Sequence, residues 1–341
     1  MIPIKNLFFI LCYSWSRLDE GELVDASIDH IKAPQDLLAL ILINGTNRLL
    51  KDGLDRGYLE FAEESSSLRG RINFSGSISR LLFEQAKAAT LVDELSHNIL
   101  HNQILKSTLT TLANSAAIDV KLRADLIRLV RNLKEVDLIR LSASVFKRVQ
   151  IHQNNSFYTF LINVCELVYL QLTPDSQVGD TKMRDFSRDE VKMRKVFQDF
   201  AFNFYKKNQN EYQVFSERLT WSAQGAEEDL SMLPYMYTDV SLSSANRKII
   251  LDTKYYQEAF QTNWGRHSFH NSHLYQLYTY LDCSRREMSD GKKVDGVLLY
   301  PATNDEFTFK FSVREHSITV AAIDMRKNTS EISERMLEIL K

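Results

Sequence analysis

Apolar residues recur every three to four positions along much of the chain, a spacing typical of amphipathic helices packed on a core. It predicts helices over 35–54, 100–113, 122–133, 155–172, 187–207, 272–286 and 330–340. Elsewhere apolar and polar residues alternate or form short apolar runs, which is typical of strands. These patterns predict strands over 58–62, 69–74, 235–242, 247–256, 297–300, 306–313 and 318–324.

The clearest interruption of these patterns is the segment TPDSQVGDTKMR at 173–184, where Pro, Gly, Asp and Ser cluster. A chain of 341 residues has room for two domains of roughly 100 to 200 residues each. We therefore predict domains at 1–175 and 176–341. Helices and strands mix in both, so the expected fold class is α/β (α+β), with the order α, β, β, α, β, β, β, α in the second domain.

The two strands at 235–242 and 247–256 are separated by Ser243 to Asn246, a link that suits a tight hairpin turn. Asp239 falls on the first strand, and Asp252 and Lys254 fall on the second. Because side chains alternate along a strand, Asp252 and Lys254 point the same way, and the pairing brings Asp239 beside them. Two neighbouring carboxylates repel each other unless a cation lies between them.

Oxygen ligands at about 2.0 to 2.1 Å are what Mg²⁺ requires, so Asp239, Asp252 and the carbonyl of Thr253 are the candidate metal ligands. An ammonium beside such a metal can orient water or stabilise charge on a phosphoryl oxygen, which gives Lys254 a role. A D-x-K pattern alone favours an exposed ion pair of little consequence. Here, however, it follows the buried run Ile249 to Leu251.

A second pattern strengthens the catalytic interpretation. In the helix that follows the hairpin, Gln276 and Tyr280 are four residues apart and share one face. An amide and a phenol at these positions suit hydrogen bonding to a phosphate or to water, whereas a simple core helix favours Leu or Ile. The alternative is an aromatic packing face, since Tyr275 and Tyr278 lie close by.

Charge and cysteine content limit the kind of DNA contact and the cellular compartment that we expect. Lys and Arg number 42 and Asp and Glu 44, so the net charge of −2 requires any DNA contact to come from a local patch. Three cysteines fit neither a disulfide framework nor a zinc knuckle, and a reducing cytoplasm is the simplest location. No run approaches the roughly 18 apolar residues of a membrane span, so we expect no membrane association.

Taken together, Asp239, the run ILDTKYY at 250–256 and the Gln276–Tyr280 helix resemble the PD-(D/E)XK nuclease core. The whole chain resembles the McrC family, the nuclease subunits of McrBC modification-dependent restriction systems. The blocks that carry this likeness are IPIKNLFFILCYSW at 2–15, LRGRINF at 68–74, NQILKSTL at 102–109 and LLYP at 298–301. They occur in the family's order and span nearly the full length.

The resemblance implies Mg²⁺-dependent cleavage of double-stranded methylated DNA, together with an McrB-like AAA+ partner that hydrolyses GTP. It implies that Asp239 and Asp252 bind the metal, that Lys254 is the catalytic lysine and that Gln276 and Tyr280 support it. The first domain would dock on the partner and stimulate its GTPase. No G-x-x-x-x-G-K-[ST] motif occurs, so the GTP would belong to the partner.

Two positions depart from the family pattern. Pro234 lies five residues ahead of Asp239 instead of close to it, which is tolerable because the metal needs the carboxylate. Many relatives in the nuclease superfamily also place a Glu on the first core helix, where this chain has Gln198. An amide is a poorer ligand, and we expect the neighbouring Asp199 to be misdirected.

Other residues give weaker signals. His267, His270 and His273 lie three apart, a spacing that can bind zinc but is more typical here of a phosphate-contacting or solvated loop. We predict DNA contacts at Arg266, His270 and Arg285, to which Arg286, Lys206 and Lys207 add positive charge. Arg69, Gly70 and Arg71 predict a turn or bulge that projects two guanidinium groups toward the partner, with a solvated hairpin tip as the alternative.

The leading hypothesis is therefore a DNA endonuclease subunit that works only with its GTPase partner. A non-catalytic adaptor that only docks on and activates the partner is the alternative, and retention of Asp239, Asp252 and Lys254 argues against it. A self-sufficient nuclease is disfavoured because no base-reading module is evident. If each chain carries one active site, a double-strand break requires two copies in the assembly.

Overall fold

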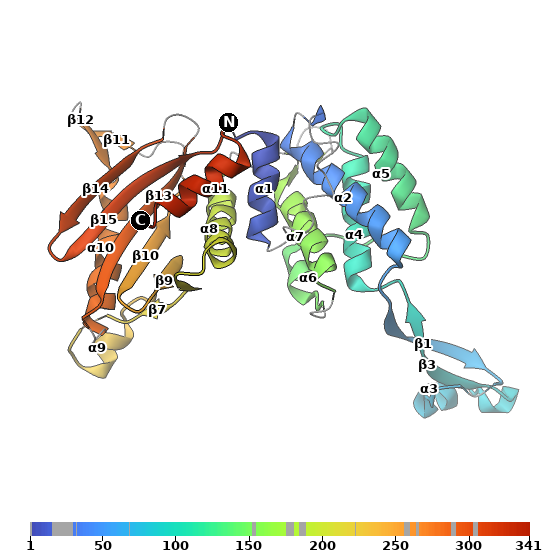
Figure 1. The fold of residues 1–341 in the computed structure, drawn as a ribbon. Helices are drawn as coiled ribbons and strands as arrows, with labels where there is room; N and C mark the ends of the chain where they lie inside the picture. Colours follow the sequence, from blue (N-terminus) through green and yellow to red (C-terminus); the bar gives the residue numbers. More distant parts are fainter. Residues whose placement is uncertain are drawn as a thin grey trace. The chain divides into compact units, whose positions relative to one another are not determined.

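The computed structural model describes residues 2–15, 30–31, 33–67, 69–151, 155–174, 181–183, 189–221, 223–255, 260–263, 266–287, 291–302 and 306–341. They form two compact units. Residues 35–184 make up the helical unit, and residues 1–34 with 185–341 make up the sheet unit. Both mix helices with strands, so the predicted α/β class is confirmed (Figure 1).

Six of the described strands build the mixed sheet of the sheet unit, in the order β14-β15-β13-β10-β9-β6. The central strands β10, β13 and β15 run parallel, and β14, β9 and β6 are antiparallel to their neighbours. The predicted hairpin is present as β9 paired with β10. The bounds are Gln213–Phe215 (β6), Val240–Ser243 (β9), Arg247–Thr253 (β10), Lys293–Ala302 (β13), Thr308–Val313 (β14) and His316–Asp324 (β15).

The helix α10 (Asn271–Glu287) covers one face of this sheet. Its Leu277 and Leu281 pack in one buried cluster with Ile250 of β10 and Leu298 of β13. A Cβ at Gly296 would lie 2.8 Å from Leu281 and 2.9 Å from Leu277, so the glycine permits close approach of helix and strand. The buried β10 and β13 runs are those expected of parallel strands covered on both faces.

The helices α1 (Ile4–Ser14) and α8 (Glu190–Asn208) pack together within the sheet unit, although the sequence separates them widely. Ser14 donates a 2.5 Å hydrogen bond to the carbonyl of Val196, and Asn6 donates two of 2.7 Å to the carbonyls of Met325 and Lys327. The predicted range 1–175 therefore does not match a compact unit, because its first helix belongs with 185–341. Periodicity reveals the apolar face of a helix but not its distant partner.

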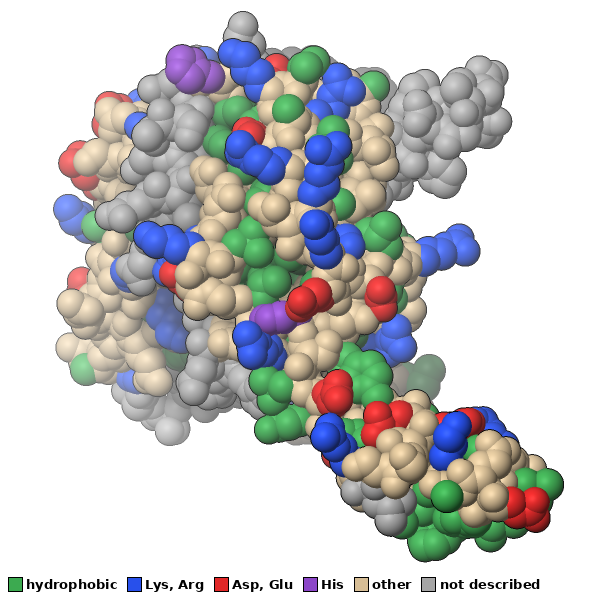
Figure 2. All heavy atoms as spheres, turned by 90° about the vertical axis from the view of Figure 1, so that its right-hand side faces the viewer, with side chains coloured by type: hydrophobic (Ala, Val, Ile, Leu, Met, Phe, Trp, Pro, Cys, Tyr) green, Lys and Arg blue, Asp and Glu red, His purple; other side chains and the backbone are tan. Residues whose placement is uncertain are grey.

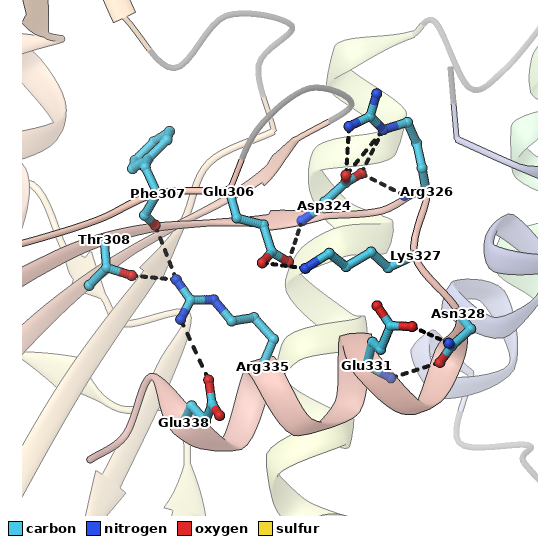
Figure 3. Close-up of polar contacts among 10 residues, drawn as sticks. All are labelled: Glu306, Phe307, Thr308, Asp324, Arg326, Lys327, Asn328, Glu331, Arg335 and Glu338. Atoms are coloured by element: carbon cyan, nitrogen blue, oxygen red, sulfur yellow. Dashed lines mark hydrogen bonds and ion pairs between the residues drawn. The ribbon is translucent and has the colours of Figure 1, made fainter.

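The helix α11 (Thr329–Glu338) is fixed against the sheet by the polar contacts in Figure 3. The side chain of Asn328 caps it by accepting a 2.9 Å hydrogen bond from the backbone N–H of Glu331. Just ahead of the cap, Arg326 pairs with Asp324 at 2.6 Å and Lys327 pairs with Glu306 at 2.7 Å. These contacts fix the turn that carries the two carbonyls held by Asn6.

The helical unit contains the helices that the sequence predicts, with ends shifted by three residues at most. It also contains α6 and a short ribbon of two strands near the boundary segment, which the sequence analysis does not predict. The bounds are Pro34–Asp52 (α2), Leu100–Ala113 (α4), Val120–Asn132 (α5), Ala143–Arg148 (α6), Ser156–Gln171 (α7), Leu172–Pro174 (β4) and Thr181–Met183 (β5).

A three-stranded sheet in the order β1-β3-β2 extends away from the helices of this unit (Figure 1). We call residues 57–96 the arm. Its elements are β1 (Gly57–Ser65), β2 (Arg71–Ile72), α3 (Phe74–Ser79), the 3₁₀ helix η3 (Phe83–Gln85) and β3 (Ala88–Ser96). The predicted strand 69–74 is therefore mostly wrong: pairing is limited to two residues, since Asn73 caps a helix that starts at Phe74.

The remaining described elements are short. They are β7 (Arg218–Leu219), α9 (Glu227–Ser231), β8 (Met236–Tyr237), β11 (Phe260–Asn263) and β12 (Arg266–Phe269). Cys12, Cys165 and Cys283 are buried, and burial raises the pKa of Cys165 to about 12. None of the helices in the described ranges has the length and apolar character to cross a membrane.

Candidate active site

The predicted catalytic residues meet where β10 ends. Asp252 is 1% exposed and Lys254, just past the strand, is 9% exposed. The Nζ atom of Lys254 lies 2.7 Å from Oδ2 of Asp252. The two side chains therefore share one side of the strand, as the i, i+2 spacing predicts.

Asp239 lies in the bend directly before β9, not on a strand as predicted. Its Oδ2 accepts a 2.7 Å hydrogen bond from the backbone N–H of Thr253 and another of 2.7 Å from the Thr253 hydroxyl. The hairpin thus brings Asp239 beside the end of β10, as expected. Thr253 holds it from the side of the strand opposite to Asp252.

Burial dominates the electrostatics of this site. It raises the pKa of Asp252 to about 7; the charge of Lys254 lowers it, and the charge of Asp239 raises it. Oδ2 of Asp252 is buried, and it has no well-aligned hydrogen-bond partner among the described residues although the ammonium is within ion-pair distance. An unsatisfied buried carboxylate oxygen next to a second carboxylate is an environment that a bound cation would relieve.

The oxygen atoms at this site suit Mg²⁺ better than they suit a metal that is bound by protein side chains alone. No group of three His, Cys, Asp or Glu side chains within the described ranges could hold an ion. Mg²⁺ usually keeps several waters and binds through one or two carboxylates and substrate phosphates. Asp239 and Asp252, with the carbonyl of Thr253, are the oxygens that this chain offers.

A chain of hydrogen bonds extends from Lys254 to α10. Lys254 Nζ donates to Oε1 of Gln276 at 2.8 Å, and Nε2 of Gln276 donates to the hydroxyl of Tyr280 at 2.8 Å. Burial raises the pKa of Tyr280, so its hydroxyl stays protonated at neutral pH. The structure therefore brings together Asp239, Asp252, Lys254, Gln276 and Tyr280, and the amide orients the lysine.

Asp199 on α8 lies within electrostatic reach of this site. The negative charge of Asp239 contributes to raising the pKa of Asp199, behind the larger effect of burial, so the two carboxylates are within electrostatic reach. Oδ1 of Asp199 pairs with Nζ of Lys195 at 2.7 Å. The side chain of Asp199 is thus held by Lys195 within electrostatic reach of Asp239, and its role as a substitute for the missing glutamate stays a prediction.

His273 lies beside the site. The spacing of the three histidines in the sequence does not predict this position. His273 is 5% exposed, and its Nδ1 lies 2.8 Å from the hydroxyl of Tyr300. Burial, followed by the positive charges of Lys254 and His270, lowers its pKa to about 4, so the ring is neutral. The signal that could have found it is its position three residues before Gln276, on the same face of the helix.

Of the predicted DNA-contacting residues, the two whose side chains the structure describes, His270 and Arg285, lie near opposite ends of α10. His270 is half-buried next to His273, with ring centroids 4.9 Å apart. Arg285 lies nine residues beyond Gln276, about 14 Å along the helix, and pairs with Glu315 at 3.5 Å. The side chains of Arg266 and His267 lie outside the described part of the structure.

In the arm, Gly70 has φ of +69°, and a Cβ there would lie 2.2 Å from the carbonyl oxygen of Leu91. The predicted turn between Arg69 and Arg71 is therefore present, and it requires glycine. Arg69 and Arg71 are exposed, and Arg71 pairs with Glu60 at 2.9 Å. The two guanidinium groups lie on the arm's surface at the start of β2.

The fold and site define a mixed α/β protein whose main sheet presents two carboxylates and a lysine at the end of its central strand. Residues 5–301 match the family described as McrBC 5-methylcytosine restriction system component, and the chain belongs to this family.

Two known proteins show the same relationship. The chain is similar to the "Type IV methyl-directed restriction enzyme EcoKMcrBC" of Escherichia coli K12, with 27% identity over 99% of this chain and 97% of that protein. It also resembles a chain of the half-complex from the tetradecameric assembly of Thermococcus gammatolerans McrB AAA+ hexamers with bound McrC. That likeness has a TM-score of 0.59 and 16% identity, over 99% of this chain and 76% of the other, and it shows the fold alone.

Proposed function

We propose that this chain is the DNA-cleaving subunit of an McrBC-type, methylcytosine-directed (type IV) restriction complex that defends against phage. It would hydrolyse phosphodiester bonds with Mg²⁺ at a PD-(D/E)XK centre formed by Asp239, Asp252 and Lys254. The observation that carries the proposal is the buried Asp252–Lys254 pair, joined at 2.7 Å and close to Asp239, at the end of a central strand. Membership of the family supports it.

The chain's own residues can divide the work as follows. Asp239 and Asp252 would hold Mg²⁺ together with the Thr253 carbonyl. A bound Mg²⁺ supplies Lewis-acid stabilisation of charge on the phosphoryl group and activates water. Lys254, positioned by Gln276, can donate hydrogen bonds to a phosphate oxygen or to the attacking water. Tyr280 fixes the amide of Gln276, so the lysine keeps its orientation.

We propose further that the chain works in the cytoplasm with an McrB-like AAA+ GTPase, which binds the GTP. The Thermococcus relative is a complex of McrB hexamers with bound McrC, which supports this partner class. The arm is the element suited to docking: it extends from the helical unit and exposes large apolar side chains. These are Tyr58, Phe61, Phe74, Ile78, Leu81, Phe83 and Leu95. Exposed apolar patches of this kind mark interaction sites, and Arg69 and Arg71 lie in the same segment.

A non-catalytic adaptor is the second candidate, because the arm could serve docking without any cleavage. The hydrogen-bonded Lys254–Gln276–Tyr280 series argues against it, since a scaffold gains nothing from ordering a buried lysine beside an aspartate.

A direct test mixes the protein with a candidate McrB-like partner, GTP and methylated plasmid. Cutting that requires the partner, GTP and Mg²⁺, and that EDTA abolishes, supports the nuclease. Unmethylated plasmid serves as the matched control. Stimulated GTP turnover without any cutting over a full Mg²⁺ titration would support the adaptor instead.

A further inference from the structure

The helix α5 and the residues after it carry an unusual excess of positive charge. From Val120 to Lys134 the sequence contains five cationic side chains and one carboxylate, Asp125, whereas the whole chain has a net charge of −2. The arm of the same unit is slightly acidic, with four cations and six carboxylates. The five cations are Lys121, Arg123, Arg128, Arg131 and Lys134.

These cations form one surface. On a helix, Lys121 and Arg128 point in nearly the same direction, because they are seven residues apart, and Arg131 lies about 80° from Lys121 around the axis, so the three share one side of α5. All three are exposed and extend over about 15 Å of the helix, and the exposed Lys134 follows just after the helix ends. Figure 2 looks at the helical unit from the side of α5 and shows Lys and Arg side chains gathered there, while carboxylates are more frequent toward the arm.

Little in the described structure neutralises this surface. Arg128 pairs with Asp125 at 2.7 Å, but Lys121, Arg131 and Lys134 have no ion pair with any described residue. The buried Nε of Arg123 also has no hydrogen-bond acceptor there. Like charges three residues apart on a helix, as at Arg128 and Arg131, destabilise it. A repulsive surface of this kind is suited to an anionic ligand.

We propose that this α5 face, formed by Lys121, Arg128, Arg131 and Lys134, contacts the phosphate backbone of double-stranded DNA. The inference deepens the proposed function and depends on it for the identity of the polyanion. Double-stranded DNA carries one charge per about 1.7 Å, so four cations spaced along the helix can face several phosphates at once.

A duplex fits this face better than a protein surface does. Protein interfaces are enriched in aromatic residues and depleted in Lys at their centre. The segment 120–134 has no aromatic residue, and its exposed apolar side chains, Val120, Ala124 and Ile127, are fewer and smaller than those of the arm. The apolar surface of the helical unit that suits a protein partner is on the arm. The two kinds of surface are therefore on different elements of one unit.

The test uses the full complex with the GTPase partner and a methylated duplex, with binding measured over a salt series. The variant Arg128→Glu/Arg131→Glu is compared with Arg128→Lys/Arg131→Lys, which keeps the charge. We expect the glutamate variant to bind DNA at least tenfold more weakly and the slope of log K against log salt to become shallower by about two units. The lysine variant should match the wild type, and GTP turnover without DNA should be stimulated normally by both.

An unchanged affinity and slope in the glutamate variant would overturn the inference. So would a loss of partner binding or of DNA-independent GTPase stimulation, because that result would assign the face to the partner. Binding is measured separately from cutting, with an Asp252→Ala background as a check. A wild-type complex that binds DNA but does not cut it would contradict the proposed nuclease function. The salt series would still test the α5 face in that case, because it measures binding alone.

Discussion

The Nζ atom of Lys254 lies 2.7 Å from Oδ2 of Asp252 at the end of a buried strand. Neither residue is more than 9% exposed. Burying two charges is costly even when they pair, and a hydrophobic pair of similar volume is often at least as stable. Stability alone therefore gives no reason to keep this pair, whereas hydrolysis of a phosphodiester does.

If Gln276 orients the lysine, Gln276→Leu should leave the ammonium held by Asp252 alone, without the second contact that fixes its direction. Cleavage should fall by about 10- to 100-fold, the usual effect of losing a supporting hydrogen bond at such a centre. Tyr280→Phe removes the acceptor for the Gln276 amide and should cost less. Initial cleavage rates on methylated plasmid at saturating Mg²⁺ check this order. Equal activity of Gln276→Leu and wild type would contradict the role given to the amide.

If the arm docks on the partner, Arg69→Ala/Arg71→Ala should reduce GTPase stimulation at least several-fold without affecting the fold. Loss of the exposed Arg71–Glu60 pair changes stability by at most about 1 kcal/mol. A titration of the partner against wild type and variant measures the effect. Arg80→Ala, which removes a comparable exposed pair of the arm with Glu64, is the matched control. Unchanged stimulation by the double variant would show that these guanidinium groups do not reach the partner.

Much of this fold follows from the sequence because its elements are strongly periodic. Helices such as 100–113 are predicted to the residue, and the β9–β10 hairpin is found where its polar turn lies. Alternation along β10 also places Asp252 and Lys254 on the same side. These are local properties, and local patterns report them well.

The rest depends on contacts between distant segments. Nothing in the first 15 residues shows that Asn6 donates hydrogen bonds to the carbonyls of Met325 and Lys327, more than 300 positions away. The arm is harder still to predict, because β1 is exposed at most positions and the buried residues of β3 are consecutive, so neither strand alternates over its full length.

The contact of Asn6 gives a stability prediction. Asn6→Ala removes both hydrogen bonds and leaves one buried and one partly buried carbonyl oxygen without a donor from Asn6, which should lower the free energy of unfolding by about 1 to 3 kcal/mol. Denaturant unfolding followed by far-UV circular dichroism measures it. The exposed Asn132 is the control, where substitution by alanine should change stability by less than about 0.5 kcal/mol. Similar small changes for both variants would show that the anchor is unimportant.

His273 predicts a pH dependence of stability. Its pKa is lowered from the usual 6.5 to about 4. Between pH 6.5 and pH 4, His273 is therefore protonated in the unfolded chain but neutral in the folded protein. The sign follows: stability contributed by neutral His273 is complete above about pH 6.5 and is lost as the pH falls toward 4, with a slope of at most about 1.4 kcal/mol per pH unit. With His273→Gln, the free energy of unfolding should fall less steeply as the pH is lowered from 6.5 to 4. Parallel curves for wild type and variant would contradict the shift.

The most direct test of the central claim compares wild type with Asp252→Ala in the complete system of partner, GTP, Mg²⁺ and methylated plasmid, measuring DNA cutting and GTP turnover in the same tubes. Asp252→Asn, which keeps the shape of the side chain, guards against a folding defect. We predict that both variants stop cutting while GTP turnover stays stimulated, because cleavage and coupling lie in different parts of the chain. Cutting at the wild-type rate by either variant would contradict the assignment of the active site to Asp252 and Lys254.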